Sequence, residues 1–189
     1  MAFKNRLGVL ASFTLARAAA IGENALTTTL FYLSGPIEYS PDLGKGWRAL
    51  SARFLISLGH SVYEPAEDEI KNLTVHEARE FRSWKKSDFP RFQKTIRKII
   101  AYDLDLIEHR CDAIVCYWDR NAGRQAGTQG ELTFAHRLGR PVYLICRVPL
   151  QEVSGWLLGC ASEVFPDVEC FLEFMKGKPF ERAAAELLP

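Results

Sequence analysis

The stretch Asp112-Ala-Ile-Val-Cys-Tyr-Trp-Asp119, followed by Ala126-Gly-Thr-Gln-Gly-Glu131, decides the fold of this chain. Its first part is a short apolar run that ends in turn-forming residues, which is typical of a buried parallel strand. Its second part predicts the start of a helix and places the carboxylate of Glu131 one turn into it. Because ligands of open α/β sheets bind outside the carboxyl ends of the strands, Glu131 is well placed to face a ligand.

Short apolar runs and helical patterns alternate on both sides of this stretch. Strands are expected at residues 30–33, 61–63, 113–117, 141–146 and 163–165. Helices are expected around the apolar repeat Trp47, Leu50, Phe54 and Leu58, which Gly59 closes, and at residues 92–109, 128–138 and 168–175. The order predicts an α/β, flavodoxin-like fold: a parallel sheet of about five strands with helices on both faces.

Two segments stand outside this pattern. Residues 1–28 are expected to be a poorly ordered N-terminal extension before a single domain at 29–189, although their basic, apolar and small residues also fit a targeting peptide that Arg17 interrupts. Residues 66–92 are polar and broken, and too long for a plain connection. We expect this second segment, with Trp84 and Phe89, to be a lid or an interface element.

Composition excludes several classes of function. The 24 Lys and Arg residues balance 23 Asp and Glu residues, so no overall charge favours a nucleic acid polymer or an anionic membrane. No apolar run is long enough to span a membrane. The five cysteines form no close pair, which indicates a reducing compartment, and we expect a cytoplasmic protein.

Motifs for cofactors, metals and serine hydrolases are missing from the sequence. The glycines at 44–46 and 123–130 match neither the P-loop nor the dinucleotide-binding pattern. The four histidines never recur at a spacing of four, and no Cys/His cluster has zinc spacing. No Gly-x-Ser-x-Gly elbow is present. We therefore expect neither a cofactor nor a metal.

Carboxylates are the remaining chemical groups of interest. Asp103, Asp105 and Asp112 gather around the entry to the strand at 113–117, and Glu131 follows its exit. The two helical aspartates also fit a solvated helix face. Thr128 and Glu131 also fit a capping box, in which the glutamate would only stabilise its own helix.

Three ordered motifs resemble the nucleoside 2-deoxyribosyltransferase family, which includes related nucleoside 5′-monophosphate N-glycosidases. They are Tyr32-Leu-Ser-Gly-Pro-Ile37, then Asp103-x-x-x-Ile107-x-x-x-x-Asp112, then Ala126-Gly-Thr-x-Gly-Glu131-x-x-x-Ala135-x-x-x-Gly139-x-Pro141-Val142. The resemblance covers about residues 29–147. It implies a flavodoxin-like enzyme that cleaves or exchanges the N-glycosidic bond of a small-molecule nucleoside or nucleotide, as a homodimer or higher homo-oligomer.

The resemblance also implies roles for individual residues. Glu131 falls on the family's nucleophilic glutamate and Tyr32 on the tyrosine that hydrogen-bonds it. Asp103 or Asp105 falls on an aspartate that acts as an acid or orients the base. Breaking the bond creates positive character at the sugar's anomeric carbon, which a carboxylate can attack. Further candidates for substrate binding are Ser34, the pocket glycine Gly35, Pro36, Ile37, Asp119, Arg124, Gln125, Gly127 and Thr128.

One departure leaves the substrate open. Gln125 stands where family members often carry Asp or Ser, while Arg120 and Arg124 are placed to meet a phosphate. Both a nucleoside and a 5′-monophosphate therefore fit, as do transfer and hydrolysis. Two alternatives remain: a phosphoribohydrolase of the cytokinin-activating type, which shares a Gly-Thr-x-x-Glu element, and a non-catalytic nucleotide-sensing module of the same fold.

Overall fold

The computed structural model describes residues 28–37, 40, 42–68, 70–122 and 126–177, and the structural statements below concern these residues. The predicted N-terminal extension lies outside them apart from Thr28. Arg124 and Gln125, two predicted substrate-binding residues, also lie outside them.

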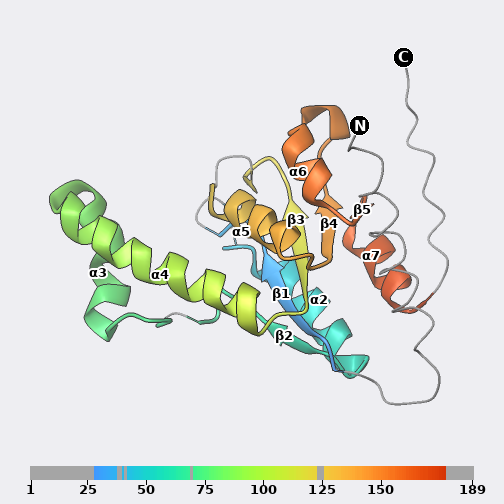
Figure 1. Ribbon diagram of the computed structural model, residues 1–189, viewed down its shortest axis with the longest axis horizontal. Helices are drawn as coiled ribbons and strands as arrows, with labels where there is room; N and C mark the ends of the chain where they lie inside the picture. Colours follow the sequence, from blue (N-terminus) through green and yellow to red (C-terminus); the bar gives the residue numbers. More distant parts are fainter. Residues whose placement is uncertain (1–27, 38–39, 41, 69, 123–125, 178–189) are drawn as a thin grey trace, which may run out of the picture.

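The centre of the molecule is a sheet of five parallel strands (Figure 1). The strands are β1 (Leu30–Ser34), β2 (Ser61–Tyr63), β3 (Ala113–Trp118), β4 (Val142–Cys146) and β5 (Glu163–Phe165), in the spatial order β2-β1-β3-β4-β5. This order confirms the predicted flavodoxin-like fold. After β1 the chain forms β2 on one side of it and then β3 on the other side, so the topological switch point lies between β1 and β3.

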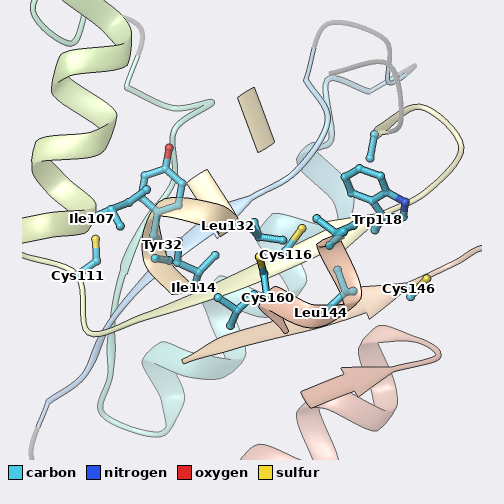
Figure 2. Packing of buried hydrophobic residues seen from close by; sticks show 14 of the residues in the cluster. Tyr32, Ile107, Cys111, Ile114, Cys116, Trp118, Leu132, Leu144, Cys146 and Cys160 are labelled. Atoms are coloured by element: carbon cyan, nitrogen blue, oxygen red, sulfur yellow. The ribbon is translucent and has the colours of Figure 1, made fainter. Parts of the chain in front are cut away.

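Successive residues of each strand point to opposite faces of the sheet and pack into two separate hydrophobic cores. Tyr32 and Ile114 point toward α4 (Phe89–His109), α5 (Ala126–Arg137) and α6 (Gly155–Cys160). Phe31 and Val115 point toward α2 (Lys45–Ser57) and α7 (Val168–Met175) on the opposite face. Figure 2 shows Tyr32 at the end of the first core, with its hydroxyl oxygen directed away from the apolar side chains. A polar atom thus leaves the core at the edge where β1 ends.

Helix α2 forms where the apolar repeat predicts it, but its most buried face is shifted from that repeat. The buried residues are Trp47, Arg48, Ser51 and Leu55, whereas Leu50 is exposed. The helix is turned so that the Arg48 guanidinium can reach backbone carbonyls, described below. Gly59 ends the helix with φ +85°, as its predicted role requires.

The expectation of a broken chain over residues 66–92 is also wrong. Helix α3 (Val75–Ser87) begins at a complete capping box, in which Thr74 and Glu77 each bond the other's backbone N–H. Asp88 then caps α4, and Pro90 lies in the first turn, where a missing N–H costs little. Leu73, Phe81 and Trp84 form a small core between the two helices. Together α3 and α4 make a hairpin that projects beyond the sheet (Figure 1).

Other differences lie near the carboxyl end of the chain. A short 3₁₀ turn (Leu150–Glu152) and α6 fill the connection between β4 and β5, where the sequence pattern predicted no element. Helix α6 has only six residues, too few for a visible apolar repeat. In the part of the chain that the structure describes, no helix is long and apolar enough to cross a membrane.

Candidate functional site

Glu131 is held by two hydroxyl groups from β1. The Tyr32 hydroxyl donates to Glu131 Oε1 at 2.9 Å, and Ser34 Oγ donates to Oε2 at 2.5 Å. Tyr32 and Ser34 are two positions apart on one strand, so their side chains leave the same face of the sheet. Each carboxylate oxygen therefore has its own donor, and the group is fixed at the carboxyl end of β1.

Burial and neighbouring charges set the protonation behaviour of this pair. Burial raises the pKa of Glu131, and the negative charge of Asp103 acts in the same direction, while the hydrogen bonds from Ser34 and Tyr32 oppose it. Burial, followed by the charge of Glu131, raises the pKa of Tyr32 well above its usual value. Tyr32 thus remains a neutral hydrogen-bond donor.

The structure contradicts the interpretation of Thr128 and Glu131 as a capping box. Helix α5 begins at Ala126, so Thr128 lies inside the helix rather than at its N-cap. Thr128 is buried, and the Glu131 carboxylate reaches β1. Glu131 therefore joins two elements of the fold instead of stabilising only the start of its own helix.

The two helical aspartates of α4 lie in different environments. Asp103 is 8% exposed, and both of its oxygens accept from Lys71 Nζ, at 2.6 and 2.8 Å. Asp105 has a side chain that is 66% exposed and lies 3.7 Å from His109 Nε2, one turn along the helix. The charge of Asp103 is among the causes that raise the pKa of both Tyr32 and Glu131.

The loop that carries Lys71 is anchored by Asp68. Asp68 Oδ2 accepts from the hydroxyls of Tyr63 at 3.1 Å and Tyr102 at 2.9 Å, and Asp68 Oδ1 accepts from the Lys71 N–H at 3.0 Å. Tyr63 ends β2 and its ring lies 5.4 Å from that of Tyr32. The loop between β2 and α3 is therefore tied to β2 and α4 beside the glutamate.

Arg48 shapes the loop after β1. Its guanidinium is fully buried and donates to the backbone carbonyls of Leu33, Gly35, Pro36, Leu43 and Gly44. A Cβ atom at Gly35 would lie 2.9 Å from the Trp47 ring and 3.1 Å from the Tyr117 carbonyl oxygen. Close packing explains the glycine, and Arg48 fixes the backbone that follows Ser34. The predicted residues Pro36 and Ile37 lie in the same loop.

The remaining predicted residues have less direct positions. Asp119 closes a turn after β3, since it accepts from the backbone N–H groups of Asn121 and Ala122. Gly127 is exposed in the first turn of α5, and nothing would obstruct a Cβ atom there. Asp112 accepts from the Leu30 N–H and so lies at the amino edge of the sheet, away from Glu131.

Metal binding has no visible basis in the described part of the chain, where no group of three His, Cys, Asp or Glu side chains could hold an ion. All five cysteines are free thiols, four of them buried. The described groups that bond to Glu131 or act on its charge include the hydroxyls of Tyr32 and Ser34, the Asp103 carboxylate and the Lys71 ammonium.

Sequence reasoning missed Lys71, Asp68, Tyr63 and Arg48. Tyr63 carried a usable signal, because it ends a parallel strand next to β1. Arg48 carried a weaker one, since it shares the helical spacing of Trp47, Ser51 and Leu55. Lys71 and Asp68 lie in a polar loop, and no local pattern marks a contact with a helix 32 residues further on.

Comparisons with known proteins agree with this fold. No model of a known protein family matches the chain, and no curated protein sequence matches it. A solved structure of the 2-deoxyribosyltransferase from the psychrotolerant bacterium Bacillus psychrosaccharolyticus does match, with a TM-score of 0.50 and 20% sequence identity. The match covers 76% of this chain and 90% of that chain. This chain has the fold of that 2-deoxyribosyltransferase.

Proposed function

We propose that this protein is an enzyme that cleaves or exchanges the N-glycosidic bond of (deoxy)nucleosides or their 5′-monophosphates, with Glu131 as the nucleophile. The observation that carries the proposal is the Glu131 carboxylate, which Tyr32 and Ser34 hold at the switch point between β1 and β3. The fold shared with a 2-deoxyribosyltransferase supports the same class of substrate.

The proposed chemistry follows from the charge that develops on the sugar. As the bond to the base breaks, the anomeric carbon gains positive character, which a nearby carboxylate stabilises and then attacks. Two hydrogen bonds restrict the rotation of Glu131, so less order has to be created in the transition state. A second base or water then releases the sugar from the glutamate, giving transfer or hydrolysis.

A panel of substrates tests the proposal. Ribonucleosides, 2′-deoxynucleosides and their 5′-monophosphates are each incubated with the protein, with and without a second free base, and the products are separated by chromatography. We expect release of a free base, or formation of a new nucleoside when the second base is present. Binding of a nucleotide whose glycosidic bond stays whole would instead support the sensing module.

A further inference from the structure

Lys71 has an unusual backbone conformation. It is not a glycine, yet its φ is +47°, in the left-handed region that side chains disfavour. Such conformations persist only where the surrounding structure enforces them, and they gather at functional sites. Here the enforcing group is Asp68, which accepts from the Lys71 N–H.

Two tyrosines hold Asp68 in place. Tyr63 and Tyr102 both donate to Asp68, so the loop is fixed to β2 and to α4 at once. The side chain of Lys71 then reaches Asp103, and both side chains are largely buried, at 11% exposure each. A chance surface ion pair would have neither the strained backbone nor the three bonds to Asp68.

The geometry of the pair indicates the charge state of Asp103. Both Asp103 oxygens lie within hydrogen-bond distance of one ammonium group. An ionised carboxylate only accepts hydrogen bonds, whereas a protonated one would carry a hydrogen on an oxygen that faces the Lys71 donors. The bidentate contact therefore favours the ionised form, in which both oxygens accept from the ammonium.

We propose that Lys71 is a positioning residue that keeps Asp103 ionised, so that Asp103 accepts a hydrogen bond from the substrate rather than protonating the leaving base. This inference rests on the proposed function, and it decides between the two roles open to the helical aspartate. The substrate group facing Asp103 must then be a donor, such as an N–H of the base or a sugar hydroxyl.

Several charged or titratable neighbours of Asp103 among the described residues enter this balance. The loop supplies Lys71 and Asp68, while β1, β2 and α5 supply Tyr32, Tyr63 and Glu131. Burial raises the pKa of Asp103, the charge of Asp68 adds to that effect, and Lys71 opposes both. Removing the ammonium should therefore raise the pKa of Asp103 further.

The pH dependence of kcat/KM separates the two roles by sign. If Asp103 must be ionised, Lys71→Met should move the acid-side midpoint upward by about one unit or more and lower the rate at neutral pH. Lys71→Arg should restore most of the wild-type profile. An unchanged acid limb in Lys71→Met, or a rate that holds or rises at neutral pH, would overturn the proposal.

A matched control addresses the loss of an ion pair as such. On the projecting hairpin, Lys98 Nζ lies 2.6 Å from Glu77 Oε1. Lys98→Met removes this ion pair and leaves the contacts of Asp103 unchanged. Its pH profile should coincide with that of the wild type. In an Asp103→Asn background, Lys71→Met should shift the profile no further, and an additional shift would count against the proposal.

An NMR titration tests the ion pair without any activity. The side-chain carboxyl ¹³C signal of Asp103, assigned with Asp103→Asn, is followed against pH in the wild type and in Lys71→Met. The pKa should be higher in the variant by about one unit or more. If no nucleoside is turned over, the proposed function fails while this titration still decides the ion pair. Equal pKa values would sink the Lys71 proposal alone.

Discussion

At the scale of single residues, Tyr32 contributes one polar atom from an otherwise apolar strand. Its ring is fully buried in the core, and its hydroxyl donates a hydrogen bond to Glu131. Phenylalanine at this position would keep the packing and remove only the donor. Tyr32 therefore offers a nearly isosteric test of the hydrogen bond.

Tyr32→Phe should lower turnover by one to two orders of magnitude, because a hydrogen bond to a charged group is worth about 1.5–3 kcal/mol. Steady-state kinetics on the substrate found by the panel measure the effect. Tyr143→Phe is the control, since Tyr143 packs with Phe165 and Phe171 in the other core. Equal rates for wild type and Tyr32→Phe would show that the bond has no part in the reaction.

The two aspartates of α4 should respond differently to the same change. Asp103→Asn removes the partner of a buried ammonium. We expect turnover to fall at least about a hundredfold, which corresponds to a loss of about 3 kcal/mol of transition-state stabilisation. Asp105→Asn changes an exposed carboxylate and should stay within a few-fold of wild type. Similar small losses from both variants would remove α4 from the chemistry.

Sequence reasoning at this scale reached residues that a motif marks. The resemblance implied the bond between Tyr32 and Glu131, and that bond is present in the structure. It left Asp103 and Asp105 undecided, because two positions on one helix differ in exposure only once the helix is docked. Ser34 was expected to bind substrate, and in the structure its hydroxyl donates to Glu131. The roles of all these residues in catalysis stay predictions.

At the scale of secondary-structure elements, the connection from β1 to α2 depends on one side chain. Arg48 donates to five backbone carbonyls and stacks over the Trp47 ring, 4.7 Å from its centroid. Burial lowers the pKa of its guanidinium, while the charges of Glu64 and Glu131 oppose that shift. The apolar repeat could not predict this, since it assumes that the buried face of a helix is apolar.

Arg48→Met should lower the free energy of unfolding by about 3 kcal/mol or more, because several buried carbonyls lose their donor. Arg48→Lys should recover only part of the loss, since an ammonium offers fewer donors than a guanidinium. Chemical denaturation measures both. Arg53→Met, an exposed arginine on the same helix, should stay within about 0.5 kcal/mol of wild type. If Arg48→Met matched Arg53→Met, the carbonyl cluster would not matter to stability.

Local signals explain which elements were predictable. Strands of three to six residues stood out because their apolar runs end at turns, and the helices closed by Gly59 and Gly139 stood out by both repeat and cap. Helix α3 was missed because only Phe81 and Trp84 of its residues are buried. Two buried residues are too few to give a clear apolar repeat. Its capping box at Thr74 was the available signal.

At the scale of the whole molecule, the α3–α4 hairpin leaves apolar side chains in solvent. Phe89 is 57% exposed and Ile100 is 50% exposed. Trp84, expected at a subunit boundary or lid, instead packs inside the hairpin, with the Arg91 guanidinium 3.7 Å from its ring centroid. Trp84→Ala would therefore disturb the hairpin itself, and Phe89 is the better probe of assembly.

We expect at least a dimer at assay concentration, and Phe89→Asp should lower the mass measured by light scattering. The reason is that a charge placed in a buried apolar contact between subunits is costly. Ile56→Asp provides the match, because Ile56 is 59% exposed on α2, away from the hairpin. A fully active wild-type monomer would rule out a site shared between subunits.

The central claim is that Glu131 breaks the glycosidic bond. The most direct measurement is the rate of free base release from the preferred nucleoside, per folded molecule, for the wild type and Glu131→Ala. We predict that Glu131→Ala loses turnover by at least about a thousandfold while thermal unfolding shows the fold retained. Release of base by Glu131→Ala within a few-fold of the wild-type rate would contradict the account.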